Sequence, residues 1–143
     1  MRIHMNVLLR SIALATLALA LAPTFIAVQT HASPTQDCQG LIAALRADTE
    51  GVVITGKNAA KDRAGLLSKL DGASTSLDRG KLCSAVQKLT DFRNKVNELI
   101  ASGKINSDPN VGVTGQDLVD DANAAIACVL GIATQSGITC PTE

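Results

Sequence analysis

KLCSAVQKLTDFRNKVNELIAS, from Lys81 to Ser102, shows the clearest helical pattern in the chain. Its apolar side chains recur every three or four residues, which places them on one face of an α-helix. They are Leu82, Ala85, Val86, Leu89, Phe92, Val96, Leu99 and Ile100. The spacing predicts an amphipathic helix over 81–102 that ends before Gly103 and needs other helices to cover its apolar face.

Three further segments show the same periodicity, over 36–54, 59–77 and 114–133. Thr35 or Asp37 is the expected N-cap of the first, and Thr114 with Asp117 predicts a capping box at the start of the last. The loop over 104–113 is polar and rich in turn residues. Because the connections are short, neighbouring helices should run antiparallel. The sequence therefore predicts an all-α fold, a small up-down four-helix bundle.

The N-terminal 32 residues are typical of a secretory signal peptide. Arg2 and Arg10 precede an apolar run over 11–22, and Thr30-His31-Ala32 offers small residues at the positions that a signal peptidase reads. We expect cleavage between Ala32 and Ser33, a secreted or extracytoplasmic location, and no stable membrane insertion afterwards. The alternative is an uncleaved membrane anchor over 7–28, which Arg10 and Pro23 interrupt.

All four cysteines lie in the remaining domain, residues 33–143: Cys38, Cys83, Cys128 and Cys140. An even number in an exported chain predicts two disulfides. Zinc is disfavoured because the gaps of 45, 45 and 12 residues lack the close ligand pairs of structural zinc sites. In an up-down bundle all four cysteines lie at the same end. Three pairings are possible, and our prediction is Cys38–Cys83 with Cys128–Cys140.

Composition excludes several classes of function. Removal of the leader takes away both histidines, the chain has no Trp or Tyr, and the only remaining aromatic residue is Phe92. Histidine-dependent catalysis and aromatic stacking platforms are therefore excluded. The 11 basic and 13 acidic residues that remain favour no nucleic-acid partner. We expect no cofactor and no catalytic residue.

Two charged groups are candidate sites. Four carboxylates near the start of the last helix could bind calcium, but their spacing does not match an EF-hand loop, and Asp117 is explained by the helix dipole. They are Asp108, Asp117, Asp120 and Asp121. A basic cluster could contact an anionic polymer, although a solvated helix face explains it better. It comprises Lys57, Lys61, Arg63 and Lys69.

Several motifs resemble one known module. They are LLSKLD over 66–71, LDRGK over 77–81, AVQKLTDF over 85–92, GQDLV over 115–119 and ANA over 122–124. This series resembles the FIMAH domain, a small helical module of exported bacterial proteins. The resemblance covers about residues 41–130 and leaves a cysteine-containing tail over 134–143. It implies an extracytoplasmic module without catalytic activity.

Three functions follow, in order of preference. The first is a secreted, non-catalytic helical binding or interaction module whose partner is a protein or an envelope component. The alternative is a secreted four-helix enzyme inhibitor. Plant invertase and pectin methylesterase inhibitors combine four helices with four cysteines, although their closely spaced first cysteine pair is absent here. The third is a carboxylate-dependent enzyme using Asp117, Asp120 or Asp121.

Overall fold

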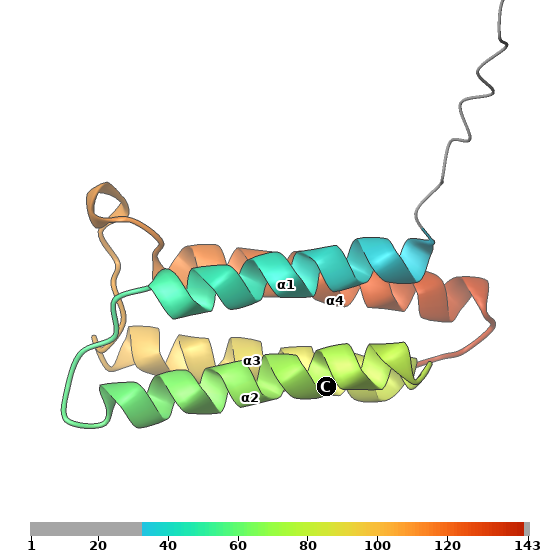
Figure 1. The fold of residues 1–143 in the computed structure, drawn as a ribbon, viewed down its shortest axis with the longest axis horizontal. Coiled ribbons are helices and arrows are strands. Elements are labelled where there is room, and N and C mark those ends of the chain that lie inside the picture. The colour runs from blue at the N-terminus through green and yellow to red at the C-terminus, as the bar shows by residue number, and fades with distance from the viewer. Residues whose placement is uncertain (1–32, 142–143) are drawn as a thin grey trace, which may run out of the picture. The chain divides into compact units, whose positions relative to one another are not determined.

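Four α-helices form most of the described chain, residues 33–141, in the computed structural model. They are α1 (Pro34–Gly51), α2 (Ala59–Asp78), α3 (Leu82–Ala101) and α4 (Gly115–Gln135), with a 3₁₀ helix η1 (Pro109–Val111) before α4. In Figure 1, α1 and α4 form one layer of the bundle, and α2 and α3 form the other. Helices consecutive along the chain pack together, α1 also packs against α4, and α1 lies diagonally from α3. The predicted all-α antiparallel bundle is confirmed.

Local sequence decides where α1 begins and ends. Ser33, and not Thr35 or Asp37, is the N-cap, because Pro34 occupies the first turn and Gln36 completes a capping box with Ser33. The helix ends at Gly51, so the β-branched residues Val52, Val53 and Ile54, which the predicted helix over 36–54 included, lie outside it. By contrast, the predicted capping box of Thr114 at the start of α4 is confirmed.

Residues 52–55, which follow α1, contact the loop between α3 and α4 at one end of the bundle. Ile54 forms an isolated antiparallel bridge with Ile105, which precedes α4 by ten residues. The Asn106 amide donates to the Val53 carbonyl over 2.9 Å, and the Thr55 amide donates to the Lys104 carbonyl over 2.8 Å. The α1–α2 and α3–α4 connections are therefore hydrogen-bonded to each other.

The core is unevenly distributed among the four helices. Seven residues of α3 and seven of α4 are buried, but only four of α1 and four of α2. Seven of the eight apolar positions predicted for α3 are among them, and Phe92 is fully buried. Burying a leucine or phenylalanine side chain contributes about 1.5–3 kcal/mol. Helix α3 therefore provides the largest share of the apolar stabilisation, because all but one of its buried side chains are larger than alanine, whereas four of the seven buried residues of α4 are Gly or Ala.

The four cysteines lie at the same end of the bundle, as predicted, but the predicted pairing is wrong. Cys38 at the start of α1 bonds to Cys128 late in α4, and Cys83 at the start of α3 bonds to Cys140 in the tail. The reason is the order of the helices around the core. Cys38 and Cys83 lie on diagonal helices, whereas α4 is next to α1. The tail reverses direction at Gly137, with a φ of 70°, and carries Cys140 to α3.

The two disulfides indicate an oxidising, extracytoplasmic environment. The predicted signal peptide and its cleavage site at Ala32 lie outside the described residues. Among the helices of residues 33–141, none has both the length and the apolar character that crossing a bilayer requires.

Candidate functional site: the interface between α1 and α2

Polar side chains and surface hollows are concentrated where α1 meets α2. At the C-terminal end of α1, Arg63 of α2 donates to the carbonyl of Glu50 over 2.8 Å and to that of Val52 over 2.7 Å. The last carbonyls of a helix have no partner within the helix. The Arg63 guanidinium therefore satisfies two of these groups and holds the N-terminal half of α2 against the end of α1.

An ion pair crosses the middle of the interface. The guanidinium of Arg46 on α1 contacts the carboxylate of Asp71 on α2 and also lies 3.3 Å from Glu50, one turn further along α1. The side chains of Arg46 and Asp71 remain 40% and 61% exposed. Solvent screens such a pair, so its contribution to stability is small, about 0–1 kcal/mol.

A third polar group lies near the disulfide end. The Gln39 amide donates to the Ser74 carbonyl over 3.0 Å and to the Asp78 carboxylate over 2.7 Å. The Ser74 hydroxyl in turn donates to the Gln39 side-chain oxygen over 2.8 Å. Polar contacts therefore span the α1/α2 interface from one end to the other.

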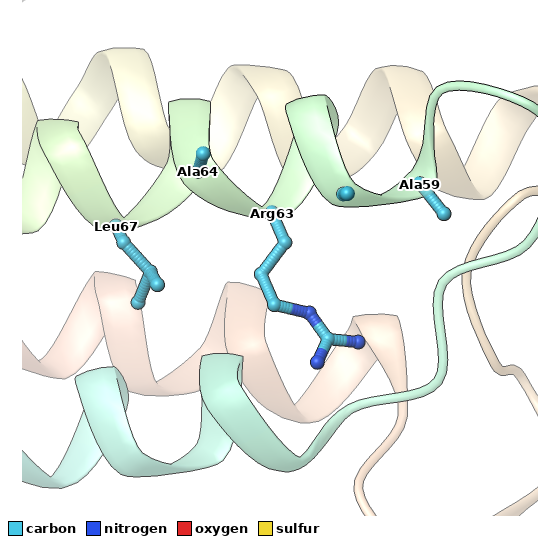
Figure 2. A pocket seen from close by; sticks show the side chains of 5 residues that line it. Ala59, Arg63, Ala64 and Leu67 are labelled. Carbon is cyan, nitrogen blue, oxygen red and sulfur yellow. The ribbon is translucent and has the colours of Figure 1, made fainter.

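Two hollows lie on this side of the bundle, one on α2 itself and one between α1 and α2. The larger, of about 420 Å³, lies on the N-terminal half of α2 and is lined by four apolar residues and one arginine: Ala59, Ala60, Arg63, Ala64 and Leu67. Figure 2 shows Arg63 extending from α2 toward the end of α1, with Leu67 on the same side of the helix. The smaller, of about 110 Å³, lies between the helices and reaches the buried side chains of Ile42 and Leu70.

The structure separates the members of the predicted basic cluster. Arg63 is half-buried and bonded to α1, whereas Lys57 and Lys61 are exposed and line neither hollow. Lys69 is half-buried and lies outside both hollows too. Only Arg63 of the four is therefore part of this site, and its role there is to cap α1.

The predicted acidic cluster is also divided. The Asp117 carboxylate accepts from the Thr114 amide and hydroxyl, both over 2.8 Å, and the backbone hydrogen bond is the main reason that the pKa of Asp117 is lowered. Asp120 accepts from Gln116 within α4, and Asp108 accepts from Asn110 in its own loop. Within residues 33–141, no three potential ligands among His, Cys, Asp and Glu are arranged to hold a metal ion.

Asp121 has a different partner, which the sequence did not suggest. Burial raises the pKa of Asp121, and the nearby negative charge of Asp48 on α1 raises it further. The two carboxylates meet across the α1/α4 interface, ten residues from Cys38 on α1 and seven from Cys128 on α4. The facing pair lines neither of the two hollows.

No protein-family model, curated protein or solved structure gives a significant match to this chain. The resemblance to the FIMAH domain therefore stays a prediction from the motifs, and the site has to be interpreted from its own chemistry. Sequence analysis missed Gln39, Arg46 and Ser74, because isolated polar residues on amphipathic helices carry no signal that distinguishes an interhelical contact from a solvated side chain.

Proposed function

We propose that this chain is an exported, non-catalytic helical binding module, released by cleavage after Ala32, whose partner is a protein or a cell-envelope component. The observation that carries the proposal is the lining of the larger hollow. Four of its five residues are apolar, and the fifth, Arg63, is already bonded to two backbone carbonyls. An apolar surface with few polar groups suits binding.

The acids favour the same interpretation. Catalysis by two carboxylates needs both groups beside a cavity that holds the substrate, with environments that separate their pKa values. Asp117 and Asp120 are bonded to neighbouring residues of α4 or its cap, and Asp121 faces Asp48 away from both hollows. This arrangement supports binding rather than chemistry.

Affinity capture with the mature domain, residues 33–143, tests the proposal. Ala64→Arg would fill the larger hollow, and Ala127→Arg is the matched control, because both alanines are exposed on helices and Ala127 lies on α4. We expect the wild type and Ala127→Arg to retain a component of the producing organism at physiological salt and then to bind it in purified form. Ala64→Arg should lose at least about tenfold in affinity. Retention of nothing, or equal binding by all three proteins, would contradict the proposal.

A second candidate, an enzyme inhibitor, is favoured by the loop before α4. Asn106 donates to the carbonyls of Asp108 and Val113, and Asp108 accepts from the Asn110 amide, so the loop is ordered by its own side chains. It projects from the bundle in Figure 1, and Val111, which belongs to η1 within this loop, is 63% exposed. An ordered projecting loop loses little entropy on binding.

The inhibitor function is tested with secreted hydrolases of the producing organism. We expect the mature domain to inhibit one of them, and Val111→Asp to remove the inhibition while the thermal unfolding midpoint stays within a few degrees of the wild-type value. Full hydrolase activity at saturating wild-type protein would exclude this candidate for the enzymes assayed.

A further inference from the structure

We propose that the bundle opens along the α1/α2 interface while the α3/α4 interface stays packed. The first observation is the extent of packing between the helices. Of the four helix pairs that pack together, α1 and α2 are in contact over the fewest residues. Because burial of apolar surface between helices is the dominant favourable term, the α1/α2 edge of the bundle is the weakest to separate.

The second observation is the kind of contact that closes each interface. Residues of α2 contact α1 and its C-terminal end through Arg63, Asp71 and Ser74. In the described chain, one side-chain hydrogen bond joins α3 to α4, from Arg93 to Asn123. Exposed polar contacts are readily replaced by water, whereas packed apolar contacts have no such substitute. The α1/α2 interface can therefore separate without leaving polar groups unsatisfied.

The third observation is the placement of the disulfides. One ties α1 to α4, and the other ties the start of α3 to the tail that follows α4. Neither involves α2, so the covalent links keep α1, α3 and α4 together and leave the α1/α2 contact free to break. Beyond the far end of the helices, no disulfide joins the two loops, which are held together by the bridge between Ile54 and Ile105 and by a hydrogen bond from the Thr55 hydroxyl to the Lys104 carbonyl.

The smaller hollow marks the place where opening begins. It already reaches Ile42 and Leu70, which are 3% and 1% exposed. Separation of α2 from α1 would uncover both side chains and join the two hollows into one apolar groove. Sub-global openings of this kind occur in elements with few buried contacts and exposed hydrogen bonds. This inference does not depend on the proposed binding function.

Labelling of an introduced cysteine by iodoacetamide tests the opening. Ile42→Cys places a thiol at the α1/α2 interface, and Val96→Cys places a thiol at another buried position, on α3. We expect Ile42→Cys to react at least about tenfold faster than Val96→Cys after correction for the unfolding equilibrium of each variant, with a weaker urea dependence. If Ile42→Cys does not fold, Leu70→Cys, across the same hollow, takes its place.

The same labelling experiment is repeated with Arg63→Gln added, and Lys61→Gln serves as the control. Lys61 is exposed on the same turn of α2 and has no hydrogen-bond partner among the described residues. Loss of the two Arg63 hydrogen bonds should accelerate labelling at residue 42 by about threefold to tenfold and leave labelling at residue 96 unchanged after the same correction. Equal corrected rates at residues 42 and 96 would overturn the proposal. So would a rate at residue 42 that responds to neither urea nor Arg63→Gln, since the reagent would then enter without any opening.

Discussion

Removal of the Cys38–Cys128 disulfide should destabilise the mature domain by about 4 kcal/mol at 25 °C. The bridge spans 90 residues of sequence, but the second bridge provides a shorter route between the same two ends. That route runs from Cys38 to Cys83 over 45 residues, crosses the second bridge, and returns from Cys140 to Cys128 over 12 residues. Its total length happens to equal the 57-residue sequence separation of the second bridge. The entropy of closing a loop of this length gives about 4.2 kcal/mol, compared with about 4.6 for 90 residues.

The assay is urea unfolding of Cys38→Ala/Cys128→Ala and of the wild type in oxidising buffer. Far-UV circular dichroism is the appropriate signal, because the chain has no Trp or Tyr and the described fold is all-helical. A small domain is stable by only about 5–15 kcal/mol, so the variant should lose a large share of its stability. Its m value should rise, since an unfolded chain with one crosslink fewer exposes more surface.

Measurement in reductant separates the crosslink from lost packing. Both proteins then lack bridges, and the remaining difference reports only the loss of the fully buried Cys38 sulfur and its partner. We expect that difference to be about 1 kcal/mol. A loss below about 1.5 kcal/mol in oxidising buffer, or an equal loss with and without reductant, would refute the entropic reasoning.

Three further perturbations act at separate points of the fold. Gly115→Ala should destabilise the domain by about 1–3 kcal/mol in urea unfolding, because the added Cβ would lie 2.7 Å from carbons of two isoleucine side chains. Gly131→Ala, where the added Cβ has open space around it, should stabilise α4 by about 0.5–1 kcal/mol. Equal effects of the two substitutions would contradict this account. Thr114→Ala removes the capping box and should cost about 1 kcal/mol in the same assay, with no loss if water replaces the hydroxyl fully. The pKa of Asp121 is raised above its ordinary value of 3.8, so its ionised form opposes folding, and stability is gained as pH falls through the folded-state pKa. Asp121→Asn should therefore be more stable than the wild type near neutral pH, and this difference in stability should vanish below about pH 3.8 in thermal melts. A difference in stability that grows in acid would contradict a raised pKa of Asp121.

Much of the fold could be predicted because its signals are local. The period of apolar residues around Phe92 placed α3 within one residue at each end, and the Thr114 capping box placed the start of α4. The first helix was predicted less well. Ser33 and Pro34 together make a helix start that competes with the capping residues expected after them, and the run after Gly51 is extended because it meets Ile105.

The candidate site could be predicted only in part. Arg63 was identified from the sequence as part of a basic cluster, but its two bonds to α1 depend on how the α1–α2 connection turns. The contact of Asp48 with Asp121 depends on the register of two helices that are far apart in sequence. Periodicity shows which face of a helix is apolar, and it contains no information on which polar residue of another helix lies opposite.

Four amphipathic helices, short antiparallel connections and the placement of four cysteines at one end of the bundle could all be predicted from the amino-acid sequence. Each of these follows from local spacing and from the alternation of direction along the chain. The disulfide pairing depends on the packing of the helices, because helices of similar amphipathicity can surround a core in more than one order, and the observed order places α1 beside α4. The same packing concentrates the large buried side chains in α3 and places exposed polar contacts along the edge of the α1/α2 interface. The physical reason is that all four helices bury their apolar faces against one another at once, so the apolar pattern of a single helix does not specify the order in which they pack.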